Sequence, residues 1–465
     1  MKELIKNFFA FGLATAIDKF ILFLLLPLYA RVFSPNEFGT VDLIQVIIGI
    51  ISIFAFLQLE TSLQRYYYTE KEKGRLIFTI SSTIFIISIF LVLIGIFFAK
   101  GISTLLFSDI SYKSAIIIAL LQIPFSVVNT INMVVLRFEK ENKKFFISII
   151  TRSASLVILV FMFIDKYKII GLFYAQLISV IIATIVSTIF IRKHIALSFS
   201  SILIKKSFKY AIPQVPARIG STANSYANRF MINSFLSIFY LGIFSMALRI
   251  GSIILLVHGV FMMAWNQFMF KIIDDPNHKK IFSSIFSMAI PLLLLMVSFI
   301  TLFSYELIYY VLSPQYIEAY KYTGFIALAY SLLILKEIVD IGPKYKEKTY
   351  LLSVNFFISV VVNLITLFVL VPIIGLLGAV VSLVLTNLSL LIASWYNSYR
   401  IYPINFSIRD LLINSFPLLL LFIFNFSEFS SLFLLKMLLA ILISIFYFYT
   451  FYLAFKKYRK PETNI

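Results

Sequence analysis

One predicted membrane-spanning segment, residues 210–236, carries a regular series of polar and cationic side chains. The series is Arg218, Ser221, Thr222, Ser225, Asn228 and Arg229. Eleven residues of an α-helix turn through about 1100°, so Arg229 returns to within about 20° of the direction of Arg218. All six side chains therefore share one helix face, about 16 Å long. Two guanidinium groups on one face can bind phosphate oxygens by paired hydrogen bonds.

This face is expected to line a wet cavity or a protein interior. An arginine that faces lipid near the bilayer centre costs about 2.5–3.5 kcal/mol even on a lenient insertion scale. Pro213 and Pro216 stand at the start of the segment and are expected to break or bend it. Broken helices beside cavities are typical of transporters. In the alternative interpretation, the two arginines extend to opposite membrane interfaces.

Other predicted spans add cations and few acids. We expect a cationic cavity whose substrate-binding residues are Arg218, Arg229, Arg249, Arg152 and Lys19. Excess positive charge concentrates anions, so the cargo is predicted to be an anion. Asp18 and Glu60 are the candidates for proton or ion coupling, because a carboxyl in a low-dielectric cavity takes up a proton nearer to neutral pH. The polar lining is completed by Ser221, Thr222, Ser225, Asn228, Gln122, Ser126 and Asn129.

The composition requires these helices to lie in a membrane. Of 465 residues, 61% are hydrophobic and 13% charged, against about 45–50% and about 25% in soluble domains. We predict an all-α polytopic membrane protein with about 14 transmembrane helices. The expected spans lie near 8–33, 40–64, 76–99, 114–136, 145–164, 170–191, 210–236, 241–264, 281–303, 322–341, 350–371, 375–396, 410–426 and 431–455. Little chain remains for a soluble catalytic domain, and no phosphate-binding G-x-x-x-x-G-K-[ST] loop occurs, which excludes a fused nucleotide-driven pump.

Several kinds of chemistry are excluded or disfavoured by composition. Cysteine is absent, which rules out disulfides and thiolate chemistry, and His194, His258 and His278 are too scattered to pair as ligands. We therefore predict no metal, no cofactor and no enzyme activity. The net charge of +19 is not clustered on a water-soluble face, so no nucleic-acid partner is expected.

Basic residues indicate the orientation in the membrane. Alternate connections on the side of the N-terminus hold 28 of the 40 Lys and Arg residues, and the opposite connections hold six. This bias places both termini in the cytoplasm of a multi-pass plasma membrane protein. Lys436, near the outer end of the last span, is expected to extend to the membrane interface.

Short repeats indicate two related halves. Gly39 and Gly242 are 203 residues apart, and the Gly-Leu pairs at 171 and 375 are 204 apart. We predict two parallel six-helix pseudo-repeats that form two lobes, residues 1–204 and 205–405. Residues 406–465 would then add helices 13 and 14 and a cytoplasmic tail.

The chain resembles the bacterial polysaccharide-biosynthesis flippases in three features. These are the fourteen spans, the Gly-Leu pairs and the sequence Leu26-Pro27-Leu28-Tyr29-Ala30-Arg31-Val32-Phe33-Ser34-Pro35-Asn36-Glu37-Phe38-Gly39. These flippases are the O-antigen and capsule transporters of the multidrug/oligosaccharidyl-lipid/polysaccharide superfamily. The likeness implies that two lobes move a polyprenyl-pyrophosphate-linked oligosaccharide, a precursor of surface polysaccharide such as lipopolysaccharide, across the bacterial inner membrane by alternating access. It also implies polysaccharide polymerase and chain-length machinery as partners. Related flippases for peptidoglycan precursors place helix-1 arginines at the pyrophosphate, where this chain offers Lys19 and Arg31.

Two other functions remain open. The same superfamily contains ion-coupled exporters of small drugs, whose mostly cationic cargo a cavity rich in arginine would repel. A polysaccharide polymerase-type membrane enzyme would need catalytic groups in a large outward loop. The longest outward connection, residues 304–321, holds only Glu306 and Glu318 among tyrosines and is expected to be an interfacial loop.

Overall fold

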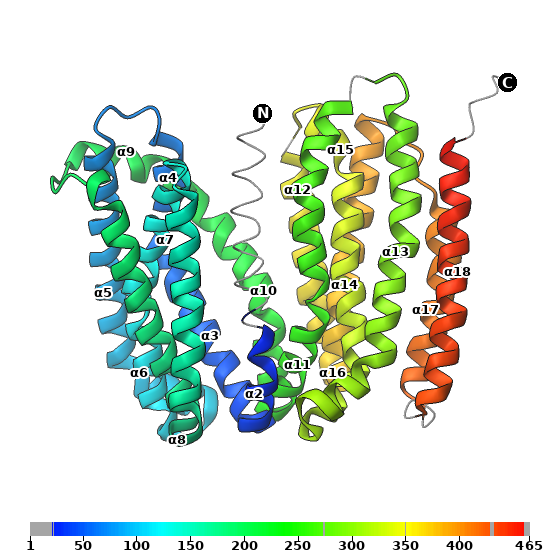
Figure 1. The fold of residues 1–465 in the computed structure, drawn as a ribbon, viewed down its shortest axis with the longest axis horizontal. Helices are drawn as coiled ribbons and strands as arrows, with labels where there is room; N and C mark the ends of the chain where they lie inside the picture. Colours follow the sequence, from blue (N-terminus) through cyan, green and yellow to red (C-terminus); the bar gives the residue numbers. More distant parts are fainter. Residues whose placement is uncertain (1–20, 22, 273–274, 349, 428–431, 460–465) are drawn as a thin grey trace. The chain divides into compact units, whose positions relative to one another are not determined.

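The computed structural model describes residues 21, 23–272, 275–348, 350–427 and 432–459, and every regular element among them is helical (Figure 1). Lys19 and Asp18 lie outside the described residues. By contacts the chain divides into two compact units, residues 1–226 and 227–465. The boundary falls inside a single helix, α10. The expected three-part division at 204/205 and 405/406 stays a prediction.

The first unit is built from helices that run back and forth between two ends. Its elements are α2 (Leu26–Val32), α3 (Pro35–Phe56), α4 (Leu59–Tyr66), α5 (Lys73–Phe107), a short 3₁₀ helix (Ile110–Tyr112), α6 (Lys113–Leu121), α7 (Ile123–Phe138), α8 (Asn142–Ile191), a 3₁₀ turn (Arg192–His194), α9 (Ser201–Ala211), a second 3₁₀ turn (Ile212–Gln214) and the first part of α10 (Val215–Phe235). Helices α5, α6 and α7 pack on one another, and α7 packs along α8.

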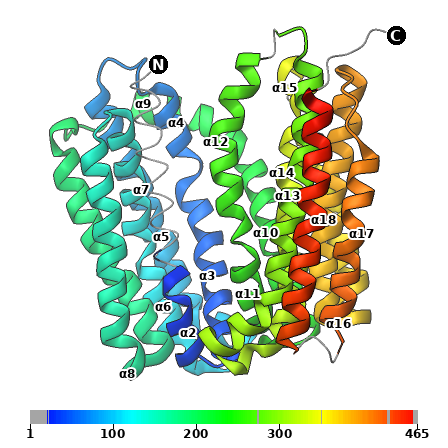
Figure 2. The ribbon, with the colours of Figure 1, turned by 45° about the vertical axis from the view of Figure 1, so that its right-hand side comes forward.

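The second unit contains the rest of α10 and a larger set of antiparallel helices. Its further elements are α11 (Ile238–Gly251), α12 (Ile254–Ile272), α13 (His278–Glu306), a π-helical turn (Leu307–Leu312), a 3₁₀ turn (Pro314–Ala319), α14 (Tyr320–Val339), α15 (Ile341–Tyr345), α16 (Tyr350–Ile401), α17 (Ile408–Asn425) and α18 (Phe433–Arg459). Both α17 and α18 pack on α13, and Figure 2 shows α18 beside it. A buried core that includes Trp265, Phe282 and Phe286 lies among these helices.

The outer surfaces of the helices are apolar, as lipid requires. Leu434, Leu438 and Ile441 on α18 are exposed, and so are Phe97 and Leu105 on α5. Within the described residues nine helices are long and apolar enough to span a membrane, and ten if the bent pair α11 and α12 is counted. Each span predicted beyond residue 33 overlaps a helix of the structure, which confirms the all-α membrane class. The number fourteen stays a prediction.

The two longest helices each break in the middle, and the breaks are equivalent. In α8 the backbone departs from helical geometry at Lys168 (φ 50°, ψ −126°), and in α16 it does so at Ile374 and Gly375, with Gly375 at φ 60°, ψ −137°. Lys168 and Gly375 are 207 residues apart, so the structural repeat here runs three residues beyond the offset of 204 read from the Gly-Leu pairs. The Gly-Leu pairs gave the shorter offset because Gly375 occupies the turn itself, the position that Lys168 holds in α8.

Close helix packing after each break explains a second pair of glycines. A Cβ atom at Gly171 would lie 2.3 Å from the carbonyl oxygen of Phe163, and one at Gly378 would lie 2.3 Å from that of Leu370. Both distances are far inside van der Waals contact, so only glycine fits. The matching pairs Gly171 with Gly378 and Phe163 with Leu370 again differ by 207 residues.

The start of the second span in each unit is also repeated. Ser34 caps α3, where its hydroxyl accepts a hydrogen bond from the amide of Glu37 at 3.3 Å and Glu37 completes a capping box. Ser237 caps α11 in the same way, accepting from the amide of Tyr240 at 3.5 Å. Ser34 and Ser237 are 203 residues apart, the offset also read from Gly39 and Gly242.

Candidate functional site

The polar face predicted for residues 210–236 lies on a regular helix, α10. Arg218 and Ser225 are exposed, Ser221, Thr222 and Arg229 are half-buried, and Asn228 is buried. The hydroxyls of Ser221 and Ser225 donate to the carbonyls of Arg218 and Ser221, each at 2.9 Å. Because these hydroxyl protons are used within the helix, the guanidinium groups are the strong donors of this face.

The prolines at the start of this segment separate two helices. Pro213 lies in the 3₁₀ turn that follows α9, and Pro216 is the second residue of α10. Proline is tolerated in the first turn because the amide hydrogen that it lacks has no helical partner there. The expected break therefore lies between α9 and α10, and α10 itself continues through the polar residues.

Glu60 and Arg218, predicted for different roles, are brought together in the first unit. The chain turns sharply before α4, with positive φ angles at Leu57 and Gln58, and this places the half-buried Glu60 in the first turn of α4. Arg218 interacts electrostatically with the Glu60 carboxylate. One carboxylate oxygen of Glu60 is buried without a hydrogen-bond partner.

The polar stripe of α7 serves partly to pack the first unit. Asn129 is buried, and its carbonyl oxygen accepts a hydrogen bond from Ser187 of α8 at 3.0 Å. Gln122 is buried at the junction of α6 and α7, with its side-chain nitrogen unpartnered. Ser126 is half-buried one turn further along.

The remaining predicted cations are distributed over both units. Arg152 is exposed on the first half of α8 and lines a pocket together with Asn129. Arg229 and Arg249, in the second unit, are half-buried on α10 and on the last turn of α11. Arg229 interacts electrostatically with Tyr330 of α14.

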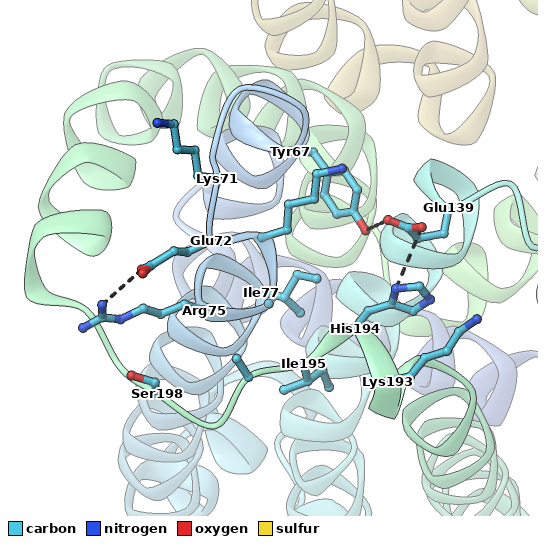
Figure 3. A pocket seen from close by; sticks show the side chains of 13 residues that line it. Tyr67, Lys71, Glu72, Arg75, Ile77, Glu139, Lys193, His194, Ile195 and Ser198 are labelled. Carbon is cyan, nitrogen blue, oxygen red and sulfur yellow. Dashed lines mark hydrogen bonds and ion pairs between the residues drawn. The ribbon is translucent and has the colours of Figure 1, made fainter.

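One cluster that sequence analysis missed joins three connections at one end of the first unit. The cluster lies at a pocket of about 560 Å³ that Figure 3 shows in close-up. The hydroxyl of Tyr67 donates to Glu139 at 2.8 Å, and the His194 ring lies 3.8 Å from Glu139 and 3.3 Å from Glu141. Lys193 contacts Glu141 at 2.8 Å, and Lys144 pairs with it as well. The sequence predicted that all three connections face the cytoplasm. That shared side of the membrane is the signal from which the cluster could have been found.

The charges of this cluster shift the acidity of its members. Burial by itself raises the pKa of Glu141, but hydrogen bonds from Lys144, Lys193 and His194 outweigh burial and lower the pKa to about 2. Burial and the hydrogen bond to Glu139 raise the pKa of the Tyr67 hydroxyl. Glu141 is therefore ionised and Tyr67 neutral at physiological pH. The cluster holds the ends of α4, α7 and α8 together.

A second ion-pair network lies at one end of α14 in the second unit. Lys336 lies 2.5 Å from Asp340 and 3.1 Å from Glu337, and Lys344 lies 2.8 Å from Glu337. Asp340 is fully buried. No group of three or more His, Cys, Asp or Glu side chains within the described ranges could hold a metal ion.

Residues 4–273 match the sequence model of the family described as polysaccharide biosynthesis protein. The chain belongs to this family. The cationic helix and the first of the paired breaks lie within the part of the chain that matches this family. None of the curated proteins compared with the chain matches it.

Solved structures show the same fold in this member of the polysaccharide biosynthesis family. The lipid II flippase MurJ in an inward closed conformation superposes with a TM-score of 0.74 at 19% identity, over 95% of this chain and 98% of that one. An inward-facing multidrug resistance MATE family transporter of the MOP superfamily gives 0.63 at 15% identity, over 84% and 94%. A MOP superfamily transporter from Pyrococcus furiosus gives 0.52 at 17% identity, over 85% and 95%. The chain has the fold of this superfamily of transporters and flippases.

Proposed function

We propose that the protein is a flippase that moves a polyprenyl-pyrophosphate-linked oligosaccharide across the bacterial plasma membrane. The observation that carries this proposal is the cationic face of α10 in a member of the polysaccharide biosynthesis family. Arg218 and Arg229 stand on one side of a helix whose other polar side chains are uncharged. A diphosphate is the charged part of such a lipid-linked glycan, and guanidinium groups match its oxygens in geometry and charge.

The energetic argument favours a charged cargo. Placing arginines in membrane helices is costly, and such residues mark substrate or ion pathways. Arg218 and Arg229 would contact the phosphates, while Arg249, Arg152 and Lys19 would add to the positive field. Transport would follow alternating access, in which each phosphate contact must be weak enough to release. Glu60 or Asp18 would couple an ion or proton to this cycle.

The proposed setting follows from the charge distribution. Both termini would lie in the cytoplasm, and the lipid carrier would remain in the bilayer while its glycan crosses. Polysaccharide polymerase and chain-length machinery on the outer side would use the product. Surface polysaccharides such as O-antigen or capsule are the corresponding end products.

An ion-coupled exporter of small molecules is the second candidate. Two observations favour it: the carboxylate oxygen of Glu60 that is buried without a hydrogen-bond partner, and the similarity in fold to a MATE family transporter. The excess of arginine on α10 argues against it, because most drugs exported by such proteins are cationic.

Complementation of a flippase-deficient strain tests the proposal. Arg218→Ala and Arg229→Ala, at matched expression, should each lower surface polysaccharide, since loss of a charge-assisted hydrogen bond costs roughly 10- to 150-fold in affinity. The lysine variants should retain part of the activity because they keep the charge. Lys100→Ala, which removes an exposed cation at the far end of α5, is the control and should behave as wild type. Wild-type polysaccharide levels from both alanine variants at limiting expression would refute the proposal.

A further inference from the structure

A small pocket between α7 and α8 contains two arginines. Its volume is about 230 Å³, and Arg137 and Arg152 line it together with Asn129, Thr130 and Ser148. Pockets for drug-sized ligands usually exceed about 300 Å³, so this one suits a small head group and not an oligosaccharide. Arg137, in the last turn of α7, was not among the site residues predicted from the sequence.

The direction of the two helices places both arginines at the same pocket. The chain turns back between α7 and α8, so α7 and the part of α8 before its break at Lys168 run antiparallel. Side chains on a helix lean toward its N-terminus. Arg137, in the last turn of α7, therefore leans back along α7, and Arg152, about 15 Å along α8 from its start, leans back toward that start, both side chains being exposed where they line the pocket. The two side chains converge on the pocket from opposite directions.

The free hydrogen-bond donors of the pocket are nitrogen atoms. The hydroxyl of Thr130 donates to the carbonyl of Ser126 at 2.9 Å, and that of Ser148 donates to the carbonyl of Lys144 at 2.9 Å, so these hydroxyl protons are used within the helices and the pocket's donors to an anion are nitrogen atoms. The carbonyl oxygen of Asn129 accepts from Ser187 at 3.0 Å, so the amide of Asn129 can serve as a donor toward the pocket. The guanidinium groups supply the charge, because none of the residues that line the pocket is acidic.

We propose that Arg137 and Arg152 bind a phosphate or diphosphate group between α7 and α8. If the proposed function holds, this group is the diphosphate of the lipid-linked cargo, and the pocket is a binding position in addition to the face of α10. Two guanidinium groups from different helices can contact both phosphates of a diphosphate, whereas a monophosphate offers less charge to neutralise. The phosphate of an anionic phospholipid has the same basic chemistry, so the test must separate the two sources.

Binding to the purified full-length protein in detergent tests the proposal without any transport step. The probes are geranyl diphosphate, inorganic pyrophosphate and short-chain phosphatidylglycerol, each titrated by calorimetry. Geranyl diphosphate should bind wild type, and Arg137→Ala and Arg152→Ala should each weaken its affinity roughly 10- to 150-fold. Lys166→Ala removes an exposed cation beside the break in the middle of α8 and should leave the affinity unchanged.

Conservative variants distinguish a loss of binding from a loss of folding. Arg137→Lys and Arg152→Lys keep the charge and should bind with intermediate affinity, at an unfolding temperature matched to wild type. Unchanged affinity in the alanine variants would overturn the proposed binding site. So would a wild-type protein that binds none of the probes. Tighter binding of phosphatidylglycerol than of either diphosphate would overturn its assignment to the cargo. If the arginine variants lose diphosphate binding while wild type fails to translocate a lipid-linked glycan, the pocket stands and the proposed function fails.

Discussion

Lys436 of α18 forms a buried ion pair with Glu306 at the end of α13. The Lys436 ammonium lies 2.8 Å and 3.0 Å from the two carboxylate oxygens of Glu306, and it sits 4.9 Å from the centre of the Tyr305 ring. Only 1% of Lys436 is exposed. The sequence predicted that Lys436 extends to the membrane interface, and this was wrong because Glu306, 130 residues earlier in the chain, provides a partner inside the protein.

Removing one member of this pair should destabilise the second unit. Lys436→Ala leaves the Glu306 carboxylate buried without compensation, a change that typically costs about 3–5 kcal/mol. Thermal unfolding in detergent should show a clear drop for Lys436→Ala, and the exchanged pair Glu306→Lys with Lys436→Glu should recover part of it. Lys457→Ala, an exposed lysine on the same helix, is the control. Equal unfolding temperatures for Lys436→Ala and Lys457→Ala would contradict this account.

The glycines that follow the two helix breaks should not accept a side chain. Gly171→Ala and Gly378→Ala each place a methyl group 2.3 Å from a carbonyl oxygen, so the backbone must shift at a cost of about 1–3 kcal/mol. Gly101→Ala is the control, because nothing lies within 4 Å of its added methyl group. That variant should be as stable as wild type or more stable by up to about 1 kcal/mol, the helix propensity difference between glycine and alanine. Fluorescence-detected size exclusion after heating compares the three variants. Gly171→Ala and Gly378→Ala should unfold at lower temperatures than Gly101→Ala.

The stability that Glu141 contributes should depend on pH. Its pKa of about 2 in the folded protein lies below the ordinary value of 4.5, so the ionised form is favoured by folding. This contribution is complete above about pH 4.5 and is lost as the pH falls toward 2. Wild type should therefore unfold at a higher temperature than Glu141→Gln at pH 6, and the difference should narrow at pH 3. A difference that stays constant between these pH values would show that the hydrogen bonds from Lys144, Lys193 and His194 do not stabilise the carboxylate.

The absence of cysteine makes the orientation directly testable. Single cysteines at positions 71, 143, 206 and 346 should be protected from an impermeant thiol reagent in intact cells, and cysteines at positions 36 and 109 should react. The first three positions lie in connections that meet at one end of the first unit, where Lys206 pairs with Glu70 at 2.9 Å. Labelling of Lys206→Cys from outside would invert the orientation.

Hydrophobic runs predicted the helices well because lipid imposes the same requirement on every span. Helix breaks inside a continuous helix were harder to locate. The sequence matched Gly171 with Gly375, whereas the structure pairs Gly171 with Gly378, because the turn and the close packing that follows it each require glycine in the second half. In the first half Lys168 takes the turn position, so its glycine signal is missing there.

The candidate site was only partly predictable. Helical periodicity sufficed to place six polar side chains on one face of α10, since they belong to one element. Periodicity does not predict which distant residues meet, so the interaction of Glu60 with Arg218 and the presence of Arg137 and Arg152 at one pocket were not foreseen. The cluster around Glu139 and His194 was missed for the same reason: its members come from three connections that are far apart in the chain.

Translocation by the purified protein in liposomes tests the central claim most directly. A fluorescent short-chain polyprenyl-diphosphate oligosaccharide is placed in both leaflets, and the fraction accessible to an external quencher is followed with time. Wild type should move the labelled lipid between leaflets, while Arg218→Ala and Arg229→Ala should do so at least about tenfold more slowly at equal reconstitution, from the loss of a charge-assisted hydrogen bond. The protein should not accumulate a cationic dye under an imposed ion gradient. Dye transport with no movement of the lipid-linked glycan, at equal rates in wild type and both arginine variants, would contradict the account.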